Sequence, residues 1–194
     1  MNSSGCVWEG PSCMKRTHRL KRLYPSMINF FIIILGCPNA EFEHVAREAL
    51  MIDETDNLRD INDLFGAMSL RLPSQHLLTP SQVEALSLLR QARIFPTRRG
   101  LENTGAYHLS TAGDEHEWFI PDDPRSSFVF ADKLSFLVLD KKLFVFKTFF
   151  DLLGLRHRFL SVAARCEAVV DDQAWMGGHL YGRWLRKRIR FVIA

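Results

Sequence analysis

The sequence predicts an α+β fold: N-terminal helices packed on a small mixed β-sheet, followed by a basic C-terminal helix. Two observations carry this prediction. Apolar residues recur with helical spacing over residues 39–92, and short β-type apolar runs alternate with turns over residues 94–140. With 194 residues, 47% of them hydrophobic, the chain can bury a core. We therefore expect one α+β module over residues 38–194, with the mixed sheet and its helices over residues 93–194.

Residues 1–37 are expected to be a disordered or weakly ordered segment with a short apolar run. The first 14 residues include two glycines, one proline and three serines without periodicity. The run Met27–Leu35 (MINFFIIIL) is almost wholly apolar, but a bilayer span takes about 20 such residues. With the basic residues before it, the run also resembles a targeting signal, although Pro25 interrupts that arrangement. Of the two interpretations, a buried strand or helix start is favoured.

Three helices are predicted within residues 39–92. Helical spacing is followed by Phe42, Val45, Ala46, Ala49 and Leu50, and again by Leu58, Ile61, Leu64, Phe65 and Met68. Asp56 or Asn57 is expected to cap the second helix. Thr79-Pro80-Ser81-Gln82 has the pattern of a capping box, with proline at the first helical position, and predicts a third helix ending near Ala92.

The second half predicts short strands and further helices. The strand candidates are Ile94–Thr97, Ala106–Thr111, Trp118–Ile120, Lys133–Leu139 and Val162–Val170. A short helical turn is expected over Ser126–Ala131. Leu143–Leu153 (LFVFKTFFDLL) is apolar on nearly all sides and predicts a buried helix that ends at Gly154. A final basic helix is expected over Gly178–Phe191.

The two ends of the chain are basic and the middle is acidic. Five basic residues cluster near the start (Lys15, Arg16, Arg19, Lys21, Arg22) and five near the end (Arg183, Arg186, Lys187, Arg188, Arg190). Without these ten, the net charge of +3 becomes −7. The C-terminal cluster, with Trp184 among it, is the candidate contact for an anion or nucleic acid. A solvated helix face is the commoner arrangement, and the basic ends would also suit an anionic lipid.

The cysteines indicate neither a metal site nor a redox pair. Cys6, Cys13, Cys37 and Cys166 are scattered, and no two have C-x-x-C spacing. Scattered cysteines are typical of an intracellular protein with free thiols, and we expect a cytoplasmic location. A Cys6–Cys13 disulfide is the alternative, with two free thiols favoured.

Other residue groupings carry no clear catalytic pattern. Gly177-Gly178 lacks the Lys-Ser/Thr of a phosphate-binding loop, and Ser161 lacks the G-x-S-x-G context of an activated serine. Asp114–Glu117, with His108 upstream, is the densest set of possible metal ligands and is interpreted as a solvated loop. Asp122-Asp123 is interpreted as a turn and helix cap rather than an acid–base pair. We therefore predict no enzyme, no cofactor and no metal.

Several short motifs resemble a segment of very large proteins, chiefly fungal, related to sacsin and the plant protein NO VEIN. The motifs are Ile94-Phe95-Pro96, Trp118–Asp122, Leu137–Asp140, Leu153-Gly154-Leu155 and Leu160-Ser161. The likeness covers residues 38–194. It implies a larger protein with a histidine-kinase/gyrase/chaperone-type ATPase domain, but this chain lacks the Asp-x-Gly-x-Gly motif of such domains. Asp53–Asn57 likewise has aspartate where their magnesium-binding motif has glutamate.

The resemblance implies a non-catalytic structural or protein-interaction module. The chain also ends on an apolar stretch, Phe191–Ala194, and we expect a fragment or truncated product of a longer protein. Its expected partner is another protein or the remainder of that polypeptide. The alternative is a nucleic-acid-binding module that uses the basic ends, although the acidic middle argues against nucleic acid. A membrane partner is not expected.

Overall fold

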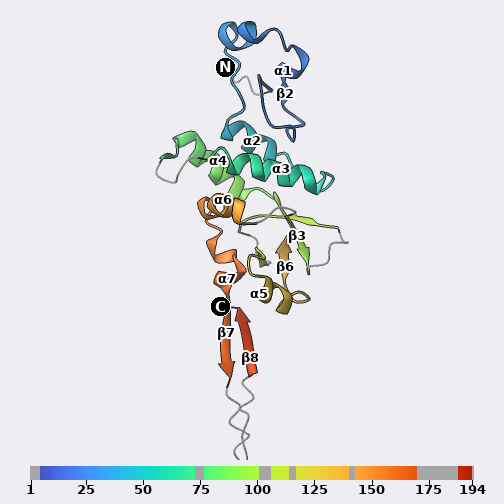
Figure 1. Cartoon of the computed structure of the whole chain (residues 1–194), viewed down its shortest axis with the longest axis vertical. Helices are drawn as coiled ribbons and strands as arrows, with labels where there is room; N and C mark the ends of the chain where they lie inside the picture. The colour runs from blue at the N-terminus through green and yellow to red at the C-terminus, as the bar shows by residue number, and fades with distance from the viewer. Residues whose placement is uncertain are drawn as a thin grey trace, which may run out of the picture.

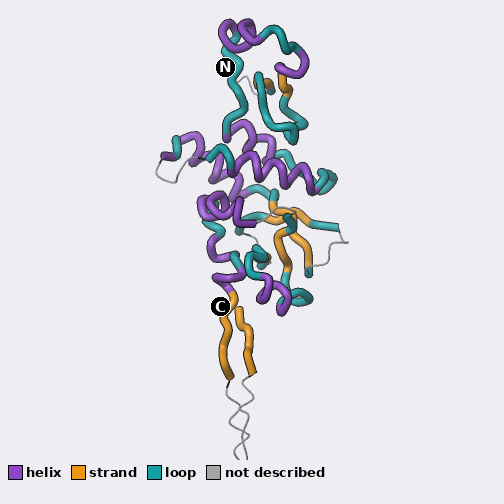
Figure 2. The backbone as a smooth tube through the Cα atoms, viewed as in Figure 1, coloured by secondary structure: helices purple, strands orange, loops and turns teal. Residues whose placement is uncertain are grey.

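The computed structural model describes residues 5–72, 77–100, 106–113, 117–139, 143–169 and 188–193. The elements follow one another along a single long axis, from an N-terminal lobe through a helical layer and a mixed sheet to a hairpin (Figure 1). Figure 2 shows the helices of the helical layer on one side of the central sheet along this axis and the strands of the hairpin at its far end. The predicted α+β class is confirmed, because helices and a small mixed sheet share one core.

The N-terminal lobe, residues 5–40, differs from the expectation of a weakly ordered segment. Its elements are β1 (Cys6–Val7), β2 (His18–Arg19), α1 (Leu20–Leu23) and the π-helix η1 (Asn29–Ile34), with β1 parallel to β2. Val7, Cys13 and Met14 belong to the main hydrophobic core. Composition gave no sign of this order, because the lobe is held by contacts to residues more than 30 positions away.

The helical layer consists of α2 (Phe42–Ala49), α3 (Leu58–Ser69) and α4 (Pro80–Gln91), as predicted. Of the two expected caps, Asn57 begins α3: its Oδ1 accepts a hydrogen bond from the Arg59 amide at 2.8 Å. The capping box of α4 is also confirmed. Thr79 Oγ1 accepts from the Gln82 amide at 3.3 Å, and Gln82 Oε1 accepts from the Thr79 amide at 3.1 Å.

The central sheet is mixed and has the strand order β4-β3-β6-β5. Its strands are β3 (Phe95–Arg99), β4 (His108–Ser110), β5 (Trp118–Phe119) and β6 (Ser135–Leu137), close to the predicted ranges. β3 is antiparallel to β4 and β6, and β5 is parallel to β6. In this register, Thr97 of β3 lies opposite His108 on one side and Leu137 on the other.

Aromatic rings join the sheet to the helices. Phe95 of β3 stacks on Phe65 of α3 at a centroid distance of 5.9 Å and on Trp118 at 5.2 Å. The predicted buried helix is confirmed as η3 (Leu143–Phe146) and α6 (Lys147–Leu152), and Gly154 ends it with φ +73°. Phe149 of α6 completes the cluster against Phe65 at 5.8 Å, so the core lies between the sheet and the helical layer.

The remaining elements follow the sheet. They are α5 (Pro124–Val129), η4 (Arg156–Arg158), α7 (Leu160–Ala163), β7 (Ala164–Val169) and β8 (Arg188–Ile193). α5 confirms the expected helical turn. β7 confirms the strand predicted over Val162–Val170. β7 and β8 form an antiparallel hairpin at the end of the long axis opposite the N-terminal lobe (Figure 1).

The predicted C-terminal helix over Gly178–Phe191 is wrong where the structure describes it. Arg188–Ile193 is strand β8, paired with β7 from Ala164↔Ile193 to Val169↔Arg188. Its sequence, RIRFVI, alternates charged and apolar residues before two β-branched ones, which favours a strand over a helix. Residues 178–187 lie outside the described part of the chain.

Candidate functional site

A buried carboxylate ties the N-terminal lobe to the helical layer. Glu48 of α2 has only 1% of its surface exposed. Its Oε1 accepts hydrogen bonds from the backbone amides of Lys15 and Arg16, both at 2.6 Å, and its Oε2 accepts from the Thr17 hydroxyl at 2.8 Å. A buried carboxylate would be costly without such donors, so these three bonds fix the path of the loop.

Ion pairs around Glu48 strengthen the same junction. Lys15 pairs with Asp60 at 2.5 Å, and Arg16 reaches both Asp53 and Asp56 at 3.2 and 3.1 Å. Two members of the first basic cluster are therefore engaged with acidic residues of the helical layer.

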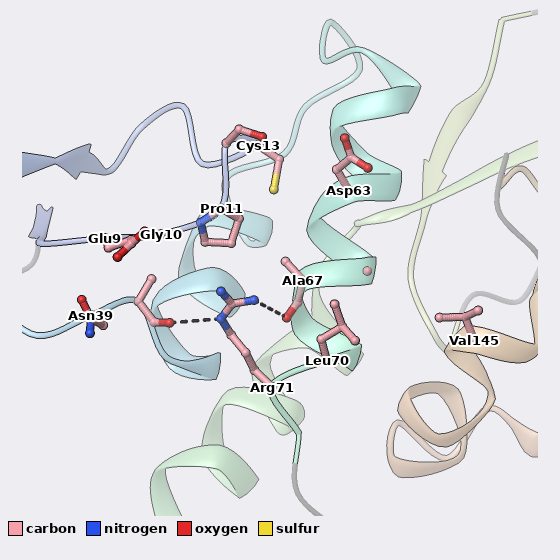
Figure 3. A pocket seen from close by; sticks show the side chains of 13 residues that line it. Glu9, Gly10, Pro11, Cys13, Asn39, Asp63, Ala67, Leu70, Arg71 and Val145 are labelled. Carbon is pink, nitrogen blue, oxygen red and sulfur yellow. Dashed lines mark hydrogen bonds between the residues drawn. The ribbon is translucent and has the colours of Figure 1, made fainter. Parts of the chain in front are cut away.

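A groove of about 700 Å³ lies between the N-terminal lobe and α3 (Figure 3). Residues from three parts of the chain line it: Glu9, Gly10, Pro11, Ser12, Cys13, Asn39, Ala40, Asp63, Gly66, Ala67, Leu70, Arg71 and Val145. Leu70 is 81% exposed at its rim. The groove thus combines apolar surface with the carboxylates of Glu9 and Asp63.

The groove keeps its shape through close backbone contacts. Arg71 Nε donates to the Ala40 carbonyl and Arg71 Nη1 to the Ala67 carbonyl, both at 3.0 Å, as Figure 3 shows. A Cβ added at Gly10 would lie 2.9 Å from the Ala40 Cβ, closer than such atoms normally approach. Glycine at this position therefore lets the two segments meet, and the arginine holds them against the end of α3.

Cys13 contributes a buried thiol to the lining of the groove. Burial raises the pKa of the Cys13 thiol, and the nearby carboxylates of Asp63, Asp60 and Glu48 add to that shift. The thiol form is therefore favoured, and a thiol is a poor nucleophile compared with the thiolate. Within the described ranges, no group of three or more histidine, cysteine or acidic side chains is arranged to hold a metal ion.

A second surface, the apolar tip, is formed by residues Leu23–Leu35 of the N-terminal lobe. Its exposed large side chains are Leu23, Tyr24, Met27, Ile28, Phe30, Ile33, Ile34 and Leu35. The expectation that Met27–Leu35 is a buried element is therefore wrong. Pattern alone did not separate burial from exposure, because burial depends on whether other segments cover the run, and no described segment outside the lobe does so. Across the described ranges, no helix has the length and apolar character needed to cross a bilayer.

The predicted turn at Asp122-Asp123 is confirmed. Asp123 caps α5, with its Oδ2 accepting from the Ser126 amide at 2.9 Å and from the Ser126 hydroxyl at 2.5 Å, and these bonds lower its pKa. Asp122 accepts from the Ser161 amide at 2.9 Å and also from the Ser161 hydroxyl. The two motifs that contain Asp122 and Ser161 thus meet through a structural link.

Other predicted site residues fall partly outside the described ranges. Arg183, Arg186 and Lys187 lie outside them, and the two described members of this cluster, Arg188 and Arg190, belong to strand β8 instead of a helix. The candidate loops with residues 114–116 and Gly177-Gly178 also lie outside. Among the described cysteines, Cys6, Cys13 and Cys37 are free.

Two of the motifs, Trp118–Asp122 and Leu160-Ser161, meet around the buried side chain of Arg158. The guanidinium of Arg158 lies 4.7 Å from the centre of the Trp118 ring and donates to the Trp118 carbonyl at 3.0 Å. The Trp118 indole N–H donates to the Thr111 carbonyl at 2.9 Å. The Ile120 amide donates to the Arg158 carbonyl at 2.8 Å, and the Leu160 amide returns a bond to Ile120 at 3.0 Å. These motifs therefore serve packing and backbone pairing.

Residues 43–164, from within α2 to the first residue of β7, match a protein family described as a domain of unknown function (DUF8348). The chain belongs to this family. The DUF8348 match includes the α3 wall of the groove but not the apolar tip or the rest of the N-terminal lobe. No curated protein and no solved structure matches the chain.

Sequence reasoning missed both Glu48 and the groove. Glu48 is a charged residue next to the apolar face of α2, and no local pattern marks it as an anchor. The groove joins segments that are far apart in the chain: Glu9 and Asp63 are 54 residues apart, and Asp63 and Val145 are 82 apart. No local pattern therefore predicts it. One available signal was the pair of small residues Gly66-Ala67 on α3, which leaves room beside the helix.

Proposed function

We propose that this DUF8348 protein is a non-catalytic protein-interaction module that binds an extended segment of a partner protein in the groove between the N-terminal lobe and α3. The groove is the observation that carries the proposal. Its volume of about 700 Å³ falls in the usual range for binding sites, and a short peptide segment fits that size. Its fixed backbone contacts mean that a partner would meet a preformed site.

The chemistry of the groove defines the partner segment. Leu70 and Val145 are exposed apolar side chains on its lining, suited to an apolar anchor. Glu9 and Asp63 bring carboxylates to the lining, with Glu9 in an exposed pair with Lys21 at 2.8 Å, and the guanidinium of Arg71 donates to two carbonyls. The segment is therefore one that carries a basic side chain close to an apolar one.

The wider setting that we propose is a large sacsin-like or NO VEIN-like ATPase protein, of which this chain is a fragment or truncated product, in the cytoplasm. The support is the resemblance of its short motifs, together with their packing roles around Trp118 and Arg158. In such a protein the module would contribute binding surface, and the ATPase domain would lie elsewhere in the polypeptide.

Selection of peptides from a random library on the whole chain tests the groove. We expect enriched peptides that pair a basic with an apolar side chain, and saturable binding of a synthetic version measured by fluorescence anisotropy. Leu70→Asp should weaken that binding at least tenfold, since a charge at an apolar anchor costs about 1.4 kcal/mol or more. Leu88→Asp is the matched control, because Leu88 is also exposed but lies on α4 outside the groove.

Three results would count against the proposal. The first is a library that yields no enriched peptide. The second is a peptide whose affinity is the same for Leu70→Asp as for the parent. The third is an equal loss of binding in Leu70→Asp and Leu88→Asp, which would place the site outside the groove.

A further inference from the structure

The apolar tip is a cluster of exposed aliphatic and aromatic side chains at one end of the molecule. Ile33 and Ile34 are 75% and 70% exposed. The tip lies at the end of the long axis, opposite the β7–β8 hairpin (Figure 1). None of its residues lines the groove, so it is a separate surface. Contiguous exposed apolar patches on folded proteins mark sites of association with proteins or membranes.

One partly buried ring holds the tip in its conformation. Phe31 packs against Trp8, Tyr24 and Phe30, with ring-centre distances of 5.9, 5.4 and 5.2 Å. The Leu35 amide donates to the Phe30 carbonyl at 3.0 Å, the five-residue bond of a π-helix. Trp8 in turn donates its amide to the Pro38 carbonyl at 2.8 Å. The exposed side chains are therefore presented by an anchored turn, and π-helical turns occur frequently at functional sites.

The stretch of sequence that carries the tip is basic. Residues 10–40 contain five lysines and arginines and no aspartate or glutamate. Lys15 and Arg16 are engaged at the junction with the helical layer, and Lys21 forms an exposed pair with Glu9 at 2.8 Å. Arg19 precedes α1 and Arg22 lies within it, and neither side chain makes a hydrogen bond or ion pair within the described ranges. The tip itself brings no carboxylate that would repel an anionic surface.

We propose that the apolar tip docks on the surface of an anionic lipid bilayer. Its aliphatic and aromatic side chains would enter the boundary between headgroups and acyl chains, while Arg19 and Arg22 contact lipid phosphates. The run is too short to span, so the contact is shallow and reversible. The position of the tip at one end of the molecule and the basic side chains beside it suit a flat anionic surface. Neither signal alone gives stable binding, but the apolar and basic contributions add.

Cosedimentation of the whole chain with vesicles tests this proposal. Vesicles of phosphatidylcholine alone are compared with vesicles that contain 30% phosphatidylserine. We expect saturable binding to the anionic vesicles, weak binding to the neutral ones, and a loss of affinity as salt is raised.

Two variants separate the apolar from the electrostatic contribution. Ile33→Ser/Ile34→Ser removes exposed apolar surface and should weaken binding at least about tenfold. Arg19→Glu/Arg22→Glu should weaken it by a similar factor and reduce its salt dependence. The matched controls are Phe128→Ser/Val129→Ser on α5 and Arg47→Glu/Lys147→Glu on the helices, which change exposed residues away from the tip. Circular dichroism confirms that each variant is folded.

The proposal is overturned if anionic vesicles do not bind the chain, or if Ile33→Ser/Ile34→Ser binds them as the parent does. A third result also overturns it: no vesicle binding, together with self-association in analytical ultracentrifugation that the same variant abolishes. The tip would then be an interface with a second copy of the chain. Because no tip residue lines the groove, failure here leaves the peptide-binding proposal standing.

Discussion

Two apolar runs of this chain resemble each other in sequence and differ in burial. Met27–Leu35 and Leu143–Leu153 each contain a Phe-Phe pair, and each ends on a leucine followed by a glycine with positive φ, Gly36 at +63° and Gly154 at +73°. In the second run, Phe149 and Phe150 are fully buried. In the first run, most large side chains face outward.

The difference lies in what the rest of the fold places against each run. Phe150 of α6 meets Phe65 of α3 at 6.4 Å and Phe159 at 6.3 Å, both from other elements of the core. Among the described residues, the rings of the tip contact rings of their own lobe, such as Trp8 on Phe31. Apolar composition therefore indicates that a run needs a partner surface, but not whether that partner belongs to the same chain.

The largest expected effect on stability comes from the core in which the second run is buried. Trp118→Ala should lower the free energy of unfolding by about 3–5 kcal/mol, because the ring stacks on Phe95 and supports the guanidinium of Arg158. Urea unfolding followed by circular dichroism measures it. The control is Phe128→Ala, since Phe128 is 81% exposed and its removal should change stability little. Equal stability of the two variants would contradict the assignment of Trp118 to the core.

A smaller loss of stability is expected at the junction between the N-terminal lobe, which carries the exposed run, and the helical layer. Glu48→Ala should cost about 2–3 kcal/mol, because the amides of Lys15 and Arg16 lose their acceptor. Glu84→Ala is the control, since Glu84 is an exposed glutamate on α4. Hydrogen exchange should also become faster at residues 13–17 in Glu48→Ala. Unchanged exchange there would mean that the lobe is attached by other contacts.

The sequence predicted the interior of this molecule better than its attachments. The helices, the central strands, the Thr79 capping box and the Asp123 cap all follow from local patterns, and each is present. The order of the N-terminal lobe does not follow from local patterns, because it depends on Glu48, a residue 31 to 33 positions away from the loop it binds. The groove was missed for the same reason. The C-terminal strand was missed because charge was weighed above the alternation in Arg188–Ile193.

The Asp123 cap gives a still smaller effect that depends on pH. Asp123→Ala should cost about 1 kcal/mol at pH 7, the usual value for losing a helix N-cap. Hydrogen bonds from the Ser126 hydroxyl and amide lower the pKa of Asp123 below its ordinary value of 3.8. Its contribution is therefore complete above that ordinary value and is lost as the pH falls through the lowered folded-state pKa.

Urea unfolding of the parent and of Asp123→Ala at pH 7 and near pH 2 checks this pH dependence of stability. The stability difference should be present at pH 7 and shrink in acid. A difference that persists or grows at low pH would show that the carboxylate is not the capping species.

The smallest expected effect on stability is that of Leu35→Ala, and its comparison with Leu153→Ala is the most direct test of the account. Leu35 and Leu153 occupy the same position in the two runs, the last residue before the positive-φ glycine, but are 54% and 2% exposed. Urea unfolding of Leu35→Ala and Leu153→Ala compares the runs with identical chemistry. We expect Leu153→Ala to lose about 2–5 kcal/mol and Leu35→Ala to stay within about 0.5 kcal/mol of the parent. A loss at Leu35 as large as that at Leu153 would show that the first run is core and would contradict its role as a binding surface.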